Sequence, residues 1–271
     1  MKKILENKLA FFGFVIVSLL AAIAILAPLI SPYDPSRIDI GNILASPSRQ
    51  HLFGTDQLGR DIFSRMIYGS RISLSIGFVS VGIATLIGVC LGSLAGYYGG
   101  KADTVISRFT DMMLCFPTIF LILAVISVIG PNIYNIMIII GMTGWMGTAR
   151  LIRAEILSLK KREFIEAARA VGASNFRIVT KHLIPNAISP VIVSATLGVA
   201  AAILVESSLS FLGLGVQPPT PSWGNMLADG KSVLGVGWWL MLFPGLSILI
   251  TVLGYNLLGE GIRDLTRSRS K

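Results

Sequence analysis

Six long apolar runs dominate this sequence and restrict the folds that it can adopt. They cover residues 9–30, 72–96, 109–129, 133–149, 187–210 and 238–258. A helix of about 20 apolar residues is long enough to cross the hydrocarbon core of a bilayer. Only 14% of the residues are charged, whereas a soluble domain has about 25%, and the mean hydropathy is +0.75. The sequence therefore predicts an all-α polytopic membrane protein with about six transmembrane helices.

The positive charge of the chain is distributed unevenly between the two sides of the predicted membrane. The formal net charge is +9, and 17 of the 23 Lys and Arg residues fall before the first run, in the segments 97–108 and 150–186, or after the last run. Cytoplasmic loops carry such an excess. The pattern predicts that both termini are cytoplasmic, and it indicates attraction to anionic membrane lipid rather than nucleic-acid binding.

The runs divide the chain into three predicted parts. Residues 1–30 form a cytoplasmic N-terminus and a first span, which is too long for the 7–15-residue core of a signal peptide. Residues 31–71 form an external segment. Residues 72–271 form a five-helix core, with a cytoplasmic loop over residues 150–186 and a short cytoplasmic turn over residues 97–108.

Glycine, proline and tryptophan suggest how the spans are shaped and packed. Gly88, Gly92 and Gly96 recur every four residues, so one face of the second run allows another helix to approach closely. This face could serve packing within the chain or contact with another subunit. Pro117 is expected to kink the third run. Trp223, Trp238 and Trp239 suit the membrane interface.

Residues for catalysis, metal binding or nucleotide binding do not form a recognisable set. Cys90 and Cys115 lie in predicted spans and are interpreted as small packing residues. Residues 230–232 read Gly-Lys-Ser, but Asn225 stands where the first glycine of a phosphate-binding loop should be. We therefore do not expect an enzyme, and no cofactor is predicted to bind to this chain.

The segment 150–186 is the most polar long interval between the spans. Phe164, Ile165, Ala168 and Val171 recur at helical spacing, which predicts a helix over residues 160–171. Gly172 is expected to end that helix, and Ser174 to cap a second short one that ends near Pro185. Such a helical hairpin suits docking into a groove on another protein. The alternative is a basic loop that only orients the protein in the membrane.

This loop resembles the EAA loop of permease subunits of binding-protein-dependent ABC importers. The resemblance rests on Glu166-Ala167-Ala168, on Gly172 and on Ile184-Pro185, although His182 replaces a usually apolar residue and Ile184 a leucine. It implies a coupling helix that docks onto an ATPase subunit. The residues implied in that contact are Phe164, Glu166, Ala167, Ala168, Arg169, Gly172 and Pro185.

Further segments resemble one subunit type, the second permease of dipeptide, oligopeptide and nickel importers. They are His51–Asp61 (HLFGTDQLGRD), Phe211–Gly215 (FLGLG), Pro218–Gly224 (PPTPSWG) and Gly259–Asp264 (GEGIRD). The resemblance implies the type I ABC importer permease fold in a bacterial or archaeal cytoplasmic membrane. It also implies a second homologous permease, two ATPase subunits that bind ATP and Mg, and an extracytoplasmic substrate-binding protein.

Peptide import is the function that this resemblance favours. A nickel or nickel-chelate importer of the same family is the alternative, and an ion-coupled secondary transporter is a remote one. A secondary transporter usually has paired ionisable residues within the membrane. In this chain only Glu206 is a plausible residue of that kind.

Four ionisable residues remain as candidates on the external side. Asp56, Arg60 and Asp61 are expected to pair locally within a structured cap, with a role in an external gate or in contact with the binding protein as a further hypothesis. Glu206 lies near the outer end of the fifth run beside several serines. Water or those hydroxyls could satisfy it, and a direct role in the gate or with the substrate is the alternative.

Overall fold

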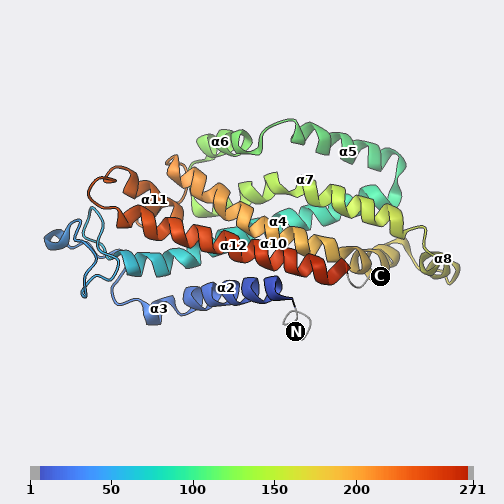
Figure 1. Ribbon diagram of the computed structural model, residues 1–271. Coiled ribbons are helices and arrows are strands. Elements are labelled where there is room, and N and C mark those ends of the chain that lie inside the picture. Colours follow the sequence, from blue (N-terminus) through green and yellow to red (C-terminus); the bar gives the residue numbers. More distant parts are fainter. Residues whose placement is uncertain (1–6, 268–271) are drawn as a thin grey trace.

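The computed structural model describes residues 7–267, which form a bundle of long helices (Figure 1). The elements are α2 (Lys8–Ile25), α3 (Ala27–Ile30), η1 (Ile40–Asn42), α4 (Ile62–Tyr98), α5 (Gly100–Leu114), α6 (Thr118–Ile129), α7 (Ile133–Leu159), α8 (Glu163–Ala170), α9 (Asn175–Arg177), η2 (Ile178–Leu183), α10 (Ile184–Phe211), α11 (Trp223–Lys231) and α12 (Trp239–Arg267). The predicted flanking charges Lys2, Lys3, Arg269 and Lys271 lie outside the described residues.

The number of apolar helices agrees with the sequence. Within residues 7–267, five helices are long and apolar enough to cross a membrane, namely α2, α4, α7, α9–α10 and α12. The pair α5–α6 makes a sixth span if it is counted as one, with a bend of 85° at its break. The prediction of an all-α membrane protein with about six spans is confirmed.

The second span begins earlier than predicted. We expected the helix to start at residue 72, but α4 starts at Ile62. The Asp61 side chain caps it by accepting a hydrogen bond from the Ser64 amide at 2.8 Å. Polar residues in the first turns concealed this start, because the apolar pattern begins only after Arg71. The cap over residues 31–61 is therefore tied directly to a spanning helix.

The predicted turn over residues 97–108 is wrong, because helix α5 occupies most of it. Gly99 and Gly100, both with positive φ, end α4 and reverse the chain within two residues. The predicted third span over residues 109–129 is likewise broken at residues 115–117. Pro117 lies at this break, where it becomes the N-cap of α6, so the expected kink is a complete interruption.

Helix α4 packs against α7 through its glycines. A Cβ at Gly88 would lie 2.6 Å from the Thr148 Cβ, and one at Gly96 would lie 3.0 Å from the Arg153 carbonyl oxygen. A Cβ at Gly92 would overlap the Ala149 carbonyl oxygen. The glycine face therefore serves packing within this chain, which resolves the two alternatives that the sequence left open.

The loop between α7 and α10 is shorter and more helical than predicted. Helix α7 runs to Leu159, and the next helix begins at Glu163 rather than at residue 160. The prediction that Pro185 lies near a helix end is wrong, because η2 is a π-helix that joins α9 to α10 without a break. Pro185 is the second residue of α10, directly after the π-helix.

Two further packing predictions are wrong. Cys90 on α4 and Cys115 at the break after α5 are exposed and are not core packing residues of this chain. Trp223 and Trp239 are buried, and their indole N–H groups donate to the carbonyl oxygens of Met66 and Thr55. Of the three predicted interface tryptophans, only Trp238 is exposed.

The polar segments gather at the two ends of the bundle. In Figure 1, α8 lies at one end, whereas α11 and the segment before α4 lie at the other. The beginning of α2 and the end of α12 point toward the α8 end. The molecule therefore has one end built around the loop α8–η2 and an opposite end built around the cap and α11.

Candidate functional site

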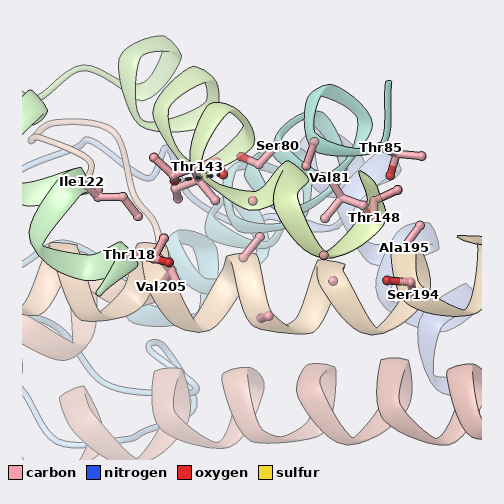
Figure 2. Close-up of a pocket in the computed structure, with 17 residues that line it drawn as sticks. Ser80, Val81, Thr85, Thr118, Ile122, Thr143, Thr148, Ser194, Ala195 and Val205 are labelled. Carbon is pink, nitrogen blue, oxygen red and sulfur yellow. Dashed lines mark hydrogen bonds between the residues drawn. The ribbon is translucent and has the colours of Figure 1, made fainter. Parts of the chain in front are cut away.

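A small open cavity lies between α4, α6, α7 and α10 (Figure 2). Its volume is about 210 Å³, and among the described residues that line it none is charged. The lining consists mainly of small residues: three glycines, four alanines and six serines or threonines. Small side chains on three neighbouring spans therefore leave a groove.

The hydroxyl groups in this groove fall into two classes. Ser80 donates to the Met137 carbonyl and Thr143 to the Ile139 carbonyl, so both are occupied within the bundle. Thr85, Thr118, Thr148 and Ser194 make no side-chain hydrogen bond to any residue in the described part of the chain. The groove thus presents free hydroxyls in an uncharged setting.

The second candidate site is the loop between α7 and α10, which forms the α8 end of the bundle. Ile165 and Ala168 of α8 are buried against Ile178 and Leu183, which holds the short helix onto the bundle. The exposed face carries Phe164, and the chain beyond α8 exposes further large apolar side chains. These are Val171, 84% exposed, and Phe176, 78% exposed. The loop therefore presents an apolar tip on a firmly packed base.

Gly172 forms the corner of this loop as predicted. Its φ is +80°, its N–H donates to Arg169, and the Ala173 N–H donates to Ala168. This pair of bonds is a Schellman motif, in which a left-handed residue reverses the chain after a helix. Ser174 then caps α9 through a hydrogen bond from the Arg177 amide, also as predicted.

Polar contacts brace the loop against the end of α4. The Tyr97 hydroxyl donates to the Asn175 side chain at 2.7 Å, and the Arg169 guanidinium lies 6.0 Å from the Tyr97 ring centre. The Lys160 ammonium donates to the Gly96 carbonyl at 3.1 Å. Besides its direct connection to α7, the loop is therefore joined to two spans, to α4 through these contacts and to α10 through the continuous helix.

The residues predicted for ATPase coupling lie in this loop but do not all reach its surface. Phe164, Glu166, Ala167, Arg169, Gly172 and Pro185 are exposed, whereas Ala168 is buried. Ala168 supports the helix and leaves its neighbours to face outward. Their contact with an ATPase stays a prediction.

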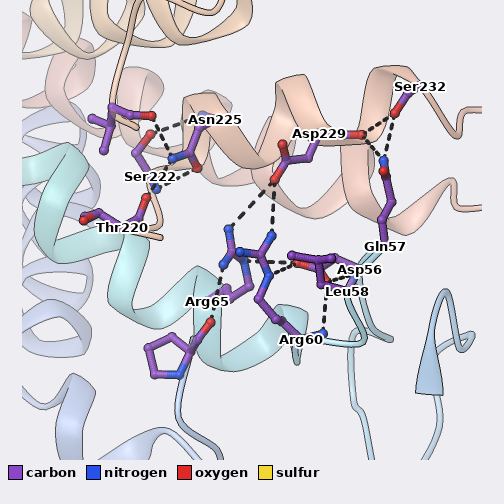
Figure 3. Close-up of polar contacts among 12 residues, drawn as sticks. Asp56, Gln57, Leu58, Arg60, Arg65, Thr220, Ser222, Asn225, Asp229 and Ser232 are labelled. Carbon is purple, nitrogen blue, oxygen red and sulfur yellow. Dashed lines mark hydrogen bonds and ion pairs between the residues drawn. The ribbon is translucent and has the colours of Figure 1, made fainter. Parts of the chain in front are cut away.

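At the other end, a buried ionic network joins the cap to α11 (Figure 3). Asp56 accepts hydrogen bonds from the Arg60 side chain at 2.6 Å and from the Leu58 and Arg60 amides. The fully buried Arg65 lies 3.6 Å from the same carboxylate. Both guanidinium groups also approach Asp229 of α11, at 3.7 and 3.9 Å.

The predicted local pairing of the cap residues is thus confirmed for Asp56 and Arg60. Asp61 belongs to a separate contact, in which its carboxylate lies 2.9 Å from Nδ1 of His51 while also capping α4. The side chains of all three predicted residues are buried. Their proposed contact with a binding protein stays a prediction. Within this chain, Asp56 and Arg60 pair with each other and Asp61 caps α4.

Glu206 ties the end of α10 to the beginning of α11. Its Oε1 accepts hydrogen bonds from Ser210 at 2.7 Å and from Ser222 at 2.9 Å. Ser222 is also the N-cap of α11 and forms a capping box with Asn225. Serine hydroxyls therefore satisfy this oxygen as expected, whereas Oε2 is buried without a partner in the described residues. Glu206 does not line the groove.

We expect Asp56→Ala to destabilise the cap strongly. Removal of one partner from a buried ion pair leaves the other charge uncompensated, which costs about 3–5 kcal/mol. Here two arginines would lose their shared carboxylate. Thermal unfolding of the detergent-purified protein should show a lower midpoint.

Asp229→Asn is the matched comparison for this network. Burial raises the pKa of Asp229, and the charges of Arg65 and Arg60 offset this only in part. Because the folded-state pKa is raised, the contribution of Asp229 to stability falls as the pH rises through that value. We therefore expect Asp229→Asn to leave the midpoint at pH 7 unchanged or slightly higher. An equal loss in both variants would contradict this distinction.

Comparison with known proteins identifies the family. Residues 88–270 match the family of binding-protein-dependent transport system inner membrane components. The chain belongs to this family. Residues 1–47 of this permease also match the N-terminal transmembrane domain of oligopeptide transport permease C.

Several curated relatives resemble this permease over nearly its whole length. The dipeptide transport system permease protein DppC of Alkalihalophilus pseudofirmus is 44% identical, over 100% of this chain and 89% of that protein. The oligopeptide transport system permease protein OppC of Bacillus subtilis is 40% identical, over 96% and 85%. The glutathione transport system permease protein GsiD of Pectobacterium atrosepticum is 40% identical, over 97% and 88%.

Solved structures support the fold of this permease. A chain of the MetNI methionine ABC transporter in an inward-facing conformation matches with a TM-score of 0.59 and 21% identity, over 75% of this chain and 95% of that chain. A chain of an amino acid ABC transporter matches with a TM-score of 0.54 and 16% identity, over 74% and 94%. The type I ABC importer permease fold is therefore confirmed.

Sequence reasoning missed several residues that build these sites in the permease. The free hydroxyls of Thr85, Thr118, Thr148 and Ser194 come from four helices and carry no local signal. Arg65 and Asp229 are distant in sequence and meet only in the folded cap. A signal was available at Ser222, because a serine followed three residues later by a polar amide is a pattern for a helix start.

Proposed function

We propose that this chain is one permease half of an ATP-driven importer of short peptides. The observation that carries the proposal is the loop at the α8 end, whose apolar tip stands on a base joined to two spans. A docking surface of this kind transmits the movement of a partner only if its base is rigid. The names of the relatives, which refer to dipeptides, oligopeptides and glutathione, support peptides as the cargo.

The proposed assembly contains a second homologous permease, two ATPase subunits and an extracytoplasmic substrate-binding protein. ATP and Mg bind to the ATPase subunits, which dock against Phe164, Val171 and Phe176. The α8 end then faces the cytoplasm, and the cap faces outward. Because the beginning of α2 and the end of α12 point toward the α8 end, both chain termini are cytoplasmic in this arrangement.

The proposed mechanism follows the two connections of the loop. Closure of the ATPases moves α8, and the contacts of Lys160 and Tyr97 carry that movement into α4. The helix that runs from α9 through η2 carries it into α10. Since α4 and α10 both border the groove, their displacement changes its width. The spans thereby open alternately to the two sides.

Purification of the tagged protein from its native membrane in mild detergent tests the assembly. We expect recovery of a second permease and two ATPases with phosphate-binding loops. The complex with its binding protein, placed in vesicles, should take up labelled alanine peptides only when ATP is supplied. Uptake of nickel but not of peptide would instead support the alternative, a nickel or nickel-chelate importer of the same family. Uptake by this chain alone without ATP would overturn the proposal in favour of a secondary transporter.

A further inference from the structure

The groove of Figure 2 lies about halfway along α4, α7 and α10, and the first turn of α6 borders it. Its residues on α4 cover 80–85 of Ile62–Tyr98, those on α7 cover 140–148 of Ile133–Leu159, and those on α10 cover 194–205 of Ile184–Phe211. We propose that this groove is a wall of the translocation pathway, and that it contacts the main chain of the passing peptide through free hydroxyls. This inference rests on the proposed function.

The orientation of the hydroxyls is the first support. Serine and threonine in membrane helices commonly donate to the carbonyl four residues earlier. Thr196, Ser207 and Thr251 do so in this chain. Ser194 does not, and Thr118 begins α6, so no carbonyl of its own helix lies four residues earlier. Figure 2 shows both side chains at the groove. A hydroxyl without a hydrogen-bond partner in an apolar setting costs free energy. A ligand with amide groups would supply the hydrogen bonds that the helices do not make to these hydroxyls.

The absence of charge among the described lining residues is the second support. Peptides differ in the charge of their side chains but share the main-chain N–H and C=O groups. A wall with fixed charges would retain some peptides and repel others, whereas hydroxyls can both donate to and accept from any main chain. The groove therefore suits weak contact with many peptides rather than tight binding of one.

The glycines of α7 provide the space for this contact. Gly144 and Gly147 are exposed at the groove, and a Cβ built at Gly147 would meet no atom within 4 Å. By contrast, the glycines that face α7 from α4 are in close contact with it. Gly147 is thus not required for packing within this chain. A second permease helix or a lipid chain could also fill such a groove, and the experiment below separates these occupants from a peptide.

Gly147→Leu in the complete importer tests the position of the pathway. The side chain would enter the groove, so we expect normal assembly but at least about a tenfold slower uptake of a labelled alanine pentapeptide, and a smaller effect on dialanine. Gly82→Leu is the control, because Gly82 is exposed on α4 outside the groove and a Cβ there also meets nothing. Failure of the Gly147 variant to assemble would instead place a helix of the second permease in the groove. Unchanged uptake by the assembled variant would place the groove outside the pathway.

Removal of the hydroxyls tests the chemistry of the contact. Thr118→Val combined with Ser194→Ala should slow alanine peptide uptake about fivefold, as expected for the loss of roughly one hydrogen bond. Thr196→Val is the control, because its hydroxyl is already bound to the Ile192 carbonyl. Equal uptake by the double variant and the control would overturn the hydroxyl contact. ATP-dependent uptake by the unmodified complex tests the proposed function separately, so the two failures are distinguishable.

Discussion

Gly172→Val should abolish most of the transport while leaving the chain folded in the membrane. Gly172 has a φ of +80°, a conformation that a β-branched residue adopts only with strain. The local cost of about 1–3 kcal/mol would shift the corner between α8 and α9 to another conformation. Such a cost changes a population by a factor of roughly 5–150. We expect the rates of ATP-dependent uptake and of peptide-stimulated ATP hydrolysis to fall by a similar factor.

Gly172→Asn provides the control for this prediction. Asparagine tolerates the left-handed conformation, and open space surrounds the position, since a Cβ there meets no atom within 4 Å. The Asn variant should therefore retain most of its uptake, although it adds a side chain at the same place. If both variants lost activity equally, the side chain itself would be the cause, and the role of the Schellman corner would be refuted. Because Gly172 lies in open space, the quantity of folded permease in the membrane should be the same for both variants.

Gly92→Ala should prevent α4 and α7 from packing together. The added methyl group would overlap the Ala149 carbonyl oxygen, which belongs to the backbone and cannot move away by changing rotamer. Overpacking of a well-packed contact costs about 1–3 kcal/mol and sometimes more. The two helices would have to separate along a face that also includes Gly88 and Gly96. We expect a lower unfolding midpoint in detergent and less folded protein in the membrane.

Gly82→Ala is the comparison that isolates packing from helix propensity. Gly82 lies on the same helix, but it is exposed and nothing lies within 4 Å of its Cβ position. Alanine forms helices more readily than glycine by about 1 kcal/mol, so this variant should be equally stable or more stable. A fall in stability that is the same at both positions would contradict the close approach of α4 and α7.

The spans and the loop could be predicted because their causes are local. An apolar run of sufficient length has few alternatives to a membrane helix, and Gly172 and Ser174 determine their corner and cap through their own backbone and side-chain chemistry. The family signatures in the loop then predicted the fold that the comparisons confirm. Individual contacts of the loop with a partner subunit remain predictions.

The remaining features could not be predicted because they depend on contacts between distant segments. Polar residues after Asp61 concealed the first turns of α4, in which Arg65 is buried close to Asp56 of the cap. The break before α6 turned one predicted span into two helices at 85°. The groove exists only where small residues of separate helices coincide, and no single helix carries that information.

The pairing of the first and last helices has a consequence for biosynthesis. Gly13 of α2 contacts the backbone of α12 near Leu258, Gly254 of α12 contacts Ile16, and Ala10 contacts Gly261 (Figure 1). Translation proceeds at about 5–20 residues per second, so α2 emerges on the order of ten to fifty seconds before its partner has been made. During this interval the small-residue face of α2 can be covered only by lipid or by the insertion machinery. The C-terminal helix thus completes the bundle, and a nascent chain that stalls before residue 239 leaves this face of its first helix uncovered, although α2 also contacts α4.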